Sequence, residues 1–328
     1  MELILQTCSG KRPDLRGNKT VAEYKDYRLD VRLLSPVGTP WQSDTLMGLM
    51  AWIVSLEEGD AGVKDFLEPF LQGDPPFVFS DGFPWGLLPK PFYPLITENK
   101  EYSVEENAQA KKRKGSPFVT LPDFDLMRRG REPTNEPISS PWTSFEMLHA
   151  AIDRKTWSTG GEGNLFTTIS DALSEDFGGL SVYVRAKADQ IGRVKGIFEV
   201  LADIGFGRDK STGHGRFEVH QIEEITLFEQ FDEANGFISM STWVPAAADP
   251  SDGFWKLNVK RGKLGEGAGK GNPFKRPVIQ FMAGSTFRTI KPPRPWYGRV
   301  VKGIAPSMPD AVQICLCLSV PCAFPPYQ

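Results

Sequence analysis

A glycine-rich stretch between Gly205 and Phe217 combines backbone freedom with positive charge. Its glycines form two spaced pairs, and because glycine lacks a Cβ, another backbone can come close to it. Cations and hydroxyls lie between the pairs, and both kinds of group suit the binding of a phosphate backbone. The residues that we predict to contact such a polyanion are Gly205, Gly207, Arg208, Lys210, Ser211, Gly213, His214, Gly215 and Arg216.

This stretch differs from the common nucleotide-binding loops. The patterns G-x-x-x-x-G-K-[ST] and G-x-G-x-x-G both require a glycine where Lys210 stands. The residues before it, Gln190 to Asp203, predict a helix with one apolar stripe, and Gly205 lies where a helix-ending glycine belongs. Alternation from Arg216 onward predicts a strand. The order is therefore helix, loop, strand, and composition alone explains it equally well as a plain connector.

Histidines are the candidates for acid–base chemistry. His149, His214 and His220 are the only ones, and no spacing pairs them with each other or with a lysine. His149 lies in a predicted strand, where a structural role is favoured over a catalytic one. Carboxylates that a metal-dependent hydrolase could use are scattered, and Asp123 and Asp125 read more simply as a solvated pair around a buried ring. The candidates of this kind are Asp81, Asp123, Asp125 and Asp153.

The cysteines predict no zinc site. None of Cys8, Cys315, Cys317 and Cys322 forms a C-x-x-C pair, and three histidines cannot complete a usual zinc set. Cys315 and Cys317 alternate with apolar residues and are expected in a buried strand. We therefore predict neither a metal nor a cofactor.

Charge is distributed unevenly along the chain. The 328 residues carry a formal net charge of −3, which excludes a globally basic nucleic-acid binder. Yet the segment from Trp255 to Lys302 holds twelve Lys or Arg residues and one acid, Glu266. The aromatic residues interleaved with it are Phe274, Phe287, Trp296 and Tyr297. Cations with stacking rings suit RNA, whereas a solvated lysine-rich face over ordinary core aromatics is the alternative.

The elements that must position these residues predict an α+β protein. A strand is expected from Tyr27 to Leu34, a helix from an N-cap at Ser43, and a second helix from Val63 to Leu71. Further strands and the helix before the glycine stretch give strand, helix, strands, helix, strand up to about Ile225. This order is the ferredoxin-like pattern with insertions, following a polar N-terminal extension. We predict a first domain over residues 1–225 and a β-rich second domain over residues 226–328.

Five segments, in order along the chain, resemble the RAMP superfamily of CRISPR-associated RNA-binding proteins. More narrowly, they resemble the subunit that caps the 5′ end of the guide RNA in type III-A (Csm) effector complexes. The first, second and fifth are 43–47 (SDTLM), 79–84 (FSDGFP) followed by 88–91 (LPKP), and 284–287 (GSTF). The third is 152–154 (IDR) followed by 163–166 (GNLF), and the fourth is the glycine-rich stretch itself.

The resemblance implies a non-catalytic subunit with two ferredoxin-like (RRM-like) domains facing each other across an RNA cleft. Such subunits hold the repeat-derived 5′ handle of the CRISPR RNA and meet target RNA only indirectly. They contact the large signalling subunit and the guide-coating backbone subunit, and they serve antiviral defence. On this basis Ser43 and Arg154 join the predicted RNA-binding residues, with Arg154 on a strand pair packed near the glycine stretch.

Three alternatives stay open. One is a RAMP endoribonuclease that processes precursor CRISPR RNA, although such enzymes tend to carry this loop near the C-terminus. Another is the capping subunit of a type III-B or III-D complex. A protein-binding scaffold without RNA affinity is the third. The sequence shows no secretory leader and no apolar run that approaches the roughly 18 residues needed to span a bilayer, so we expect a cytoplasmic protein without membrane contact.

Overall fold

The computed structural model describes residues 24–93, 111–112, 115–159, 165–265, 271–290 and 292–325. The predicted N-terminal extension up to residue 23, most of the charged stretch 97–116 and the turn residues 160–164 lie outside this part of the chain. So do Glu266, Lys270 and Lys291 of the basic segment.

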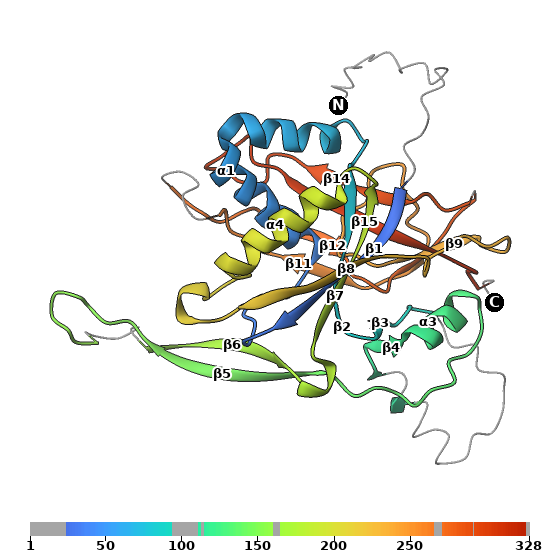
Figure 1. Cartoon of the computed structure of the whole chain (residues 1–328), viewed down its shortest axis with the longest axis horizontal. Coiled ribbons are helices and arrows are strands. Elements are labelled where there is room, and N and C mark those ends of the chain that lie inside the picture. The colour runs from blue at the N-terminus through green and yellow to red at the C-terminus, as the bar shows by residue number, and fades with distance from the viewer. Residues whose placement is uncertain are drawn as a thin grey trace, which may run out of the picture.

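The first half of the chain is built on a four-stranded antiparallel sheet (Figure 1). Its order is β2 (Phe77–Pro84), β7 (Gly179–Lys187), β1 (Tyr24–Leu33), β8 (Phe217–Ile225). Alternation in β1 places Tyr27, Leu29 and Val31 on one face, opposite apolar residues of β7. The helices α1 (Ser43–Leu71) and α4 (Ile191–Ile204) pack with this face in one hydrophobic core.

The helix α1 corrects two expectations. The two predicted helices form one helical run with a kink at Gly59, whose φ of 68° favours glycine. Ser43 is not the N-cap, because that position belongs to Gln42. The Asp81 carboxylate instead accepts the Ser43 backbone N–H at 2.8 Å, so the helix start is capped from β2.

The second half is β-rich, as predicted, and its described residues contain no α-helix. A five-stranded sheet has the order β10 (Gly253–Phe254), β13 (Thr286–Arg288), β9 (Gly236–Ser239), β15 (Gln313–Cys322), β14 (Trp296–Val301). Beside it, β11 (Leu257–Lys260) and β12 (Val278–Phe281) form a two-stranded ribbon. Cys315 and Cys317 are buried in β15 as expected.

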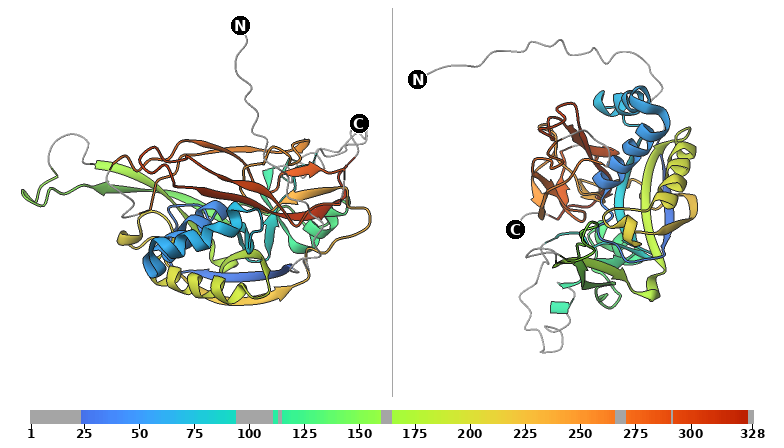
Figure 2. Two further views of the ribbon diagram at one scale, coloured as in Figure 1. Left: turned by 90° about the horizontal axis from the view of Figure 1, so that it is seen from above. Right: turned by 90° about the vertical axis from the view of Figure 1, so that its left-hand side faces the viewer.

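Smaller elements are inserted between β2 and β7. The strands β3 (Leu87–Pro89) and β4 (Phe118–Thr120) pair with each other, and α3 (Leu121–Arg128) follows. A long hairpin of β5 (Trp142–Ala150) and β6 (Leu165–Leu173) projects from the body of the molecule (Figures 1 and 2). A 3₁₀ turn, η1 (Glu175–Phe177), leads into β7, and a second one, η2 (Lys210–Thr212), lies within the glycine-rich stretch.

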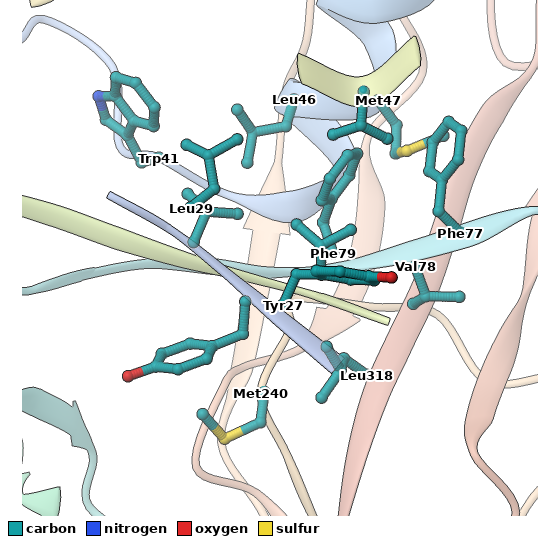
Figure 3. Close-up of a cluster of buried hydrophobic side chains, with 14 of the residues drawn as sticks. Tyr27, Leu29, Trp41, Leu46, Met47, Phe77, Val78, Phe79, Met240 and Leu318 are labelled. Atoms are coloured by element: carbon teal, nitrogen blue, oxygen red, sulfur yellow. The ribbon is translucent and has the colours of Figure 1, made fainter. Parts of the chain in front are cut away.

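Both halves contribute to one hydrophobic core. Figure 3 shows part of it, where side chains of β1, α1 and β2 meet Met240 and Leu318 from the second half. A satellite core of six residues, among them Phe237, Trp243 and Phe287, lies within the second half.

Buried charges join the two halves as well. Asp81 accepts the Thr242 backbone N–H at 2.9 Å and the Thr242 hydroxyl at 2.6 Å. Asp44 binds Lys260 and accepts from the side-chain amides of Gln280 and Gln313. Both carboxylates stand at the start of α1, so the helix N-terminus is held from both halves of the chain.

On the opposite face of the sheet, a buried arginine makes a third connection. The Arg185 guanidinium pairs with Asp26 at 2.7 Å and donates to the backbone carbonyls of Pro295 and Ser319. The predicted α+β class is confirmed, and the core runs across the expected boundary near residue 225.

Candidate nucleic-acid interface

The glycine-rich stretch is a loop between α4 and β8 that is pinned from below by aromatic stacking. The Phe206 ring is buried and stacks on Trp41, with ring centroids 4.2 Å apart, and Phe217 meets the edge of the same indole at 4.9 Å. The Gly215 backbone ties the two ends of the loop together, because its carbonyl accepts from Phe206 and its N–H donates to Pro36, both at 2.8 Å. The base of the loop is therefore fixed.

Its glycines divide into two kinds. A Cβ at Gly215 would stand 1.9 Å from the Phe206 carbonyl oxygen, and one at Gly207 would stand 2.7 Å from the Thr39 Cβ. Those two positions are required by packing. Gly213, by contrast, has a φ of 93° and open space where its Cβ would point. An incoming phosphate could approach the backbone there.

The polar side chains of the loop point outward. Arg208, Ser211 and Arg216 are exposed. Arg208 is already engaged, since it pairs with Asp209 at 3.0 Å and donates to the Ile169 carbonyl in β6. Arg216 is held only through its backbone, which donates to the Ser35 hydroxyl and accepts from the Leu34 N–H.

His214 is buried instead of displayed. It is 5% exposed, and neither ring nitrogen has a hydrogen-bond partner among the residues that the structure describes. Its backbone N–H donates to the Asp209 carbonyl, whose residue has a left-handed φ of 64°. Contact between this ring and a base requires the loop to rearrange, while the backbone of His214 shapes the loop as it stands.

Trp52 of α1 brings the glycine loop and the basic segment together. The Lys210 Nζ lies 4.7 Å from the centroid of the Trp52 ring, a cation–π contact. A Cβ at Gly265, in the loop that extends β11, would stand 3.0 Å from the same indole. The two basic stretches of the sequence therefore border on one another across α1, a proximity that no local pattern in the sequence signals.

The aromatics of the basic segment are mostly unavailable for stacking on bases. Phe287 and Tyr297 are buried and stack on Phe237 in the satellite core. Trp296 is half-buried, whereas Phe274 is exposed and lies under the Lys263 ammonium. The alternative of ordinary core aromatics is thus correct for two of the four rings.

Two predicted binding residues lie elsewhere. Ser43 is buried and donates its hydroxyl to the Thr242 carbonyl at 3.0 Å, so it joins the halves and is closed to RNA. The β5–β6 hairpin does touch the loop, but at the middle of β6, where the Ile169 carbonyl accepts from Arg208. Arg154 is exposed and follows the far end of β5, beyond the Ala150–Leu165 pair, so it is not beside the loop.

A cavity of about 1370 Å³ adjoins the loop on the other side of Trp41. Its walls come from both halves and combine aromatic rings and prolines with lysines and with Asp81 and Asp171. They include Trp41, Phe92, Trp142, Trp255, Lys90 and Lys256. Since Trp41 lines the cavity and also stacks on Phe206, the loop and the cavity share one wall. Rings with interspersed cations suit unpaired nucleotides.

The carboxylates do not assemble a metal site. Among the described residues, no group of three or more His, Cys, Asp or Glu side chains could hold a metal ion. Asp81 is fully engaged between the halves, and burial raises the pKa of its carboxyl to about 6 despite hydrogen bonds from Thr242 and Ser43 that favour the charged form. Asp123 is not solvated as expected: it is buried and accepts the Thr134 backbone N–H at 2.9 Å.

The remaining titratable candidates also lie in structural surroundings. His149 stacks on Phe166 and meets the Thr168 hydroxyl at 2.8 Å. Burial raises the pKa of the Cys315 thiol to about 12 and holds Cys317 as a neutral thiol as well. No helix in the part of the chain that the structure describes is long and apolar enough to cross a membrane.

Solved structures share this architecture, although no family model matches the sequence and no curated protein matches it. A chain of the Csm1-Csm4 cassette in complex with pppApA aligns with a TM-score of 0.64 at 16% identity, covering 92% of this chain and 100% of that one. A chain of the Csm3-Csm4 subcomplex in the type III-A CRISPR-Cas interference complex aligns with a TM-score of 0.59 at 14% identity and the same coverage. Csm4 is the subunit that the two assemblies have in common. This chain has the Csm4 fold. The resemblance that the sequence carries is thereby confirmed at the level of the fold.

In the Csm4 fold of this chain, the first, second and fifth matched segments lie where the two halves meet. Gly284 accepts the Phe92 N–H at 2.8 Å, and the Thr286 hydroxyl donates to the Phe92 carbonyl, which joins the fifth segment to the end of the second. Asp44 and Asp81, from the first two segments, connect the halves. These three segments thus build the frame, whereas part of the glycine loop and the described part of the third segment, at the tip of the β5–β6 hairpin, are exposed.

Proposed function

We propose that this chain is an RNA-binding subunit of a type III CRISPR effector complex that caps the 5′ handle of the CRISPR RNA. The observation that carries the proposal is the glycine loop. Its base is fixed by Trp41, Thr39 and Pro36, while Gly213 and the side chains of Arg208, Ser211 and Arg216 face outward. A rigid loop with open backbone and outward cations binds phosphates without the cost of ordering.

The path of the handle follows from the neighbours of the loop. Lys210 and Gly265 of the basic segment meet at Trp52, on one side. The aromatic cavity lies on the other side, behind Trp41. We infer that phosphates cross the loop and that unpaired bases enter the cavity.

The fold supports the finer architectural interpretation too. Leaving aside the insertion from β3 to β6, the first half runs β1, α1, β2, β7, α4, β8. With the sheet order β2-β7-β1-β8, we interpret it as ferredoxin-like. We interpret the helix-poor second half as a degenerate copy of that unit.

The partners of this chain are inferred from the solved complexes. The solved complexes place Csm4 with Csm1 and with Csm3, so we propose that this chain contacts the large signalling subunit and the guide-coating backbone subunit, in the cytoplasm. A non-catalytic role agrees with His149, whose ring meets a threonine hydroxyl, and with His214, whose ring nitrogens find no hydrogen-bond partner among the described residues.

Binding of handle RNA to the full chain tests the proposal. Arg208→Ala, Lys210→Ala and Arg216→Ala should each weaken binding and lower the slope of log K against log salt by roughly 0.7, the value for one phosphate contact to a single strand. Lys25→Ala, at the far end of β1 and on an exposed ion pair with Glu224, is the control and should change neither. Unchanged affinity and slope in all three loop variants would refute a loop-based RNA site.

A further inference from the structure

The β11–β12 ribbon turns its polar face toward the protein interior and most of its apolar face outward. Asn258 pairs with Gln280 and Lys260 with Val278, which puts Lys260 and Gln280 on one face. That face turns inward, because the Lys260 Nζ and the Gln280 amide both bind the buried Asp44 carboxylate. On the opposite face, Phe281 is buried against Trp243 in the satellite core, and the rest of the face is exposed.

The outward face is apolar. Leu257 and Val259 share it with Ile279, the cross-strand partner of Val259, and Trp255 continues it. The exposed fractions are 44% for Trp255, 49% for Leu257, 55% for Val259 and 62% for Ile279. Single exposed apolar residues are ordinary on a protein surface, but a contiguous group on one regular face marks an interaction site.

The surroundings of this face are positively charged. From 253 to 265 and from 271 to 290, the described residues contain no Asp or Glu. Arg261, Lys263 and Arg276 lie on the segments that extend the ribbon. The face is therefore an apolar centre with a basic rim.

We infer that this ribbon face docks a protein surface with an apolar centre and an acidic rim. An apolar core inside a polar rim is the ordinary anatomy of protein interfaces. Three of its four exposed side chains are aliphatic, whereas unpaired bases stack on aromatic rings. A second copy of this chain fits poorly, because a two-fold contact would set one basic rim against another.

The choice of partner rests on the proposed function, which offers the large subunit and the backbone subunit as candidates. The test measures association of the full chain with each purified subunit and, separately, with handle RNA. The variants are Ile279→Glu in the apolar centre and Arg261→Glu in the rim. Leu56→Glu is the matched control, since Leu56 is 61% exposed on α1, outside the ribbon.

Ile279→Glu is expected to weaken association with one of the two subunits at least tenfold while handle RNA affinity stays within twofold. Arg261→Glu should weaken the same association, most at low salt, and Leu56→Glu should change neither. Backbone amides of β11 and β12 should gain protection from hydrogen exchange when that subunit is added.

Four results would overturn the inference. Ile279→Glu could bind both subunits as well as Leu56→Glu does, or it could lose RNA binding instead of protein binding. The ribbon could already be fully protected in the isolated chain, or the isolated chain could be a dimer that Ile279→Glu converts to a monomer. Failure of the wild-type chain to bind handle RNA would refute the capping function alone, because the subunit measurements are made without RNA.

Discussion

Gly213→Ala and Gly73→Ala form a matched pair that separates RNA binding by the glycine loop from a mere connecting role. Both glycines have positive φ, 93° and 76°, and a Cβ at either position meets nothing within 4 Å. The two glycines lie near opposite ends of β1. Gly73 precedes β2, and the first residue of β2, Phe77, is level with Lys25 of β1, because both pair with Ala186. The glycine loop ends at Phe217, which pairs with Leu33 at the other end of β1. The two ends of β1 are roughly 26 Å apart at 3.3 Å per residue.

The stability cost of the two substitutions should be the same. A left-handed alanine costs about 1–2 kcal/mol, and the loss of unfolded-state freedom returns about 0.4–1 kcal/mol. Each variant should therefore lose about 1 kcal/mol of unfolding free energy. Only at Gly213 would the added methyl stand where we place a phosphate, and we expect at least a tenfold loss of affinity there, or about 1.4 kcal/mol.

Urea unfolding of both variants gives the stability arm, and filter binding of handle RNA at several salt concentrations gives the binding arm. We expect Gly213→Ala and Gly73→Ala to lose the same unfolding free energy, and we expect only Gly213→Ala to lose RNA affinity. If both variants bind RNA as the wild type does, no phosphate approaches Gly213 and the reasoning about its open backbone is wrong.

Three further predictions concern the frame and the chemistry. Asp81→Asn should remove the contribution of this carboxyl to the pH dependence of stability. The folded-state pKa of about 6 lies above the ordinary 3.8, so the wild type should lose about 2 kcal/mol of unfolding free energy relative to the variant as pH rises from 4 to 7. Parallel stability–pH curves would contradict this. Arg185→Leu should cost about 3 kcal/mol in urea unfolding, because Asp26 and two carbonyls lose their partner; a cost below about 1 kcal/mol would show that the halves do not depend on it. The full chain incubated with precursor CRISPR RNA, with and without divalent metal, should cut nothing, and specific cleavage that His214→Ala or His149→Ala abolishes would favour the processing enzyme.

Local patterns in the sequence predicted the elements whose periodicity is complete. The alternation of Tyr27, Leu29 and Val31 defined β1, and the stripe that begins at Ile191 defined α4 up to its glycine. The α+β class and the β-rich second half follow from such patterns.

Contacts between distant residues could not be predicted in this way. Ser43 has the residue type of an N-cap, yet its hydroxyl donates to a carbonyl 199 residues away. Asp44 and Asp81 look like surface charges in the sequence and are buried because their partners come from the other half. No local pattern around Trp52 indicated that this side chain lies between Lys210 and the basic segment.

The buried charges that connect the halves have a consequence for the order of synthesis. Asp81 needs Thr242, Arg185 needs the carbonyl of Ser319, and Asp44 needs Gln313. When the ribosome has completed the first sheet, each of these three side chains therefore still lacks partners that have not been translated. We expect the nascent chain to stay open, and accessible to chaperones, until β15 emerges. A gene truncated near residue 235 should accordingly yield an aggregating fragment, not a smaller folded protein.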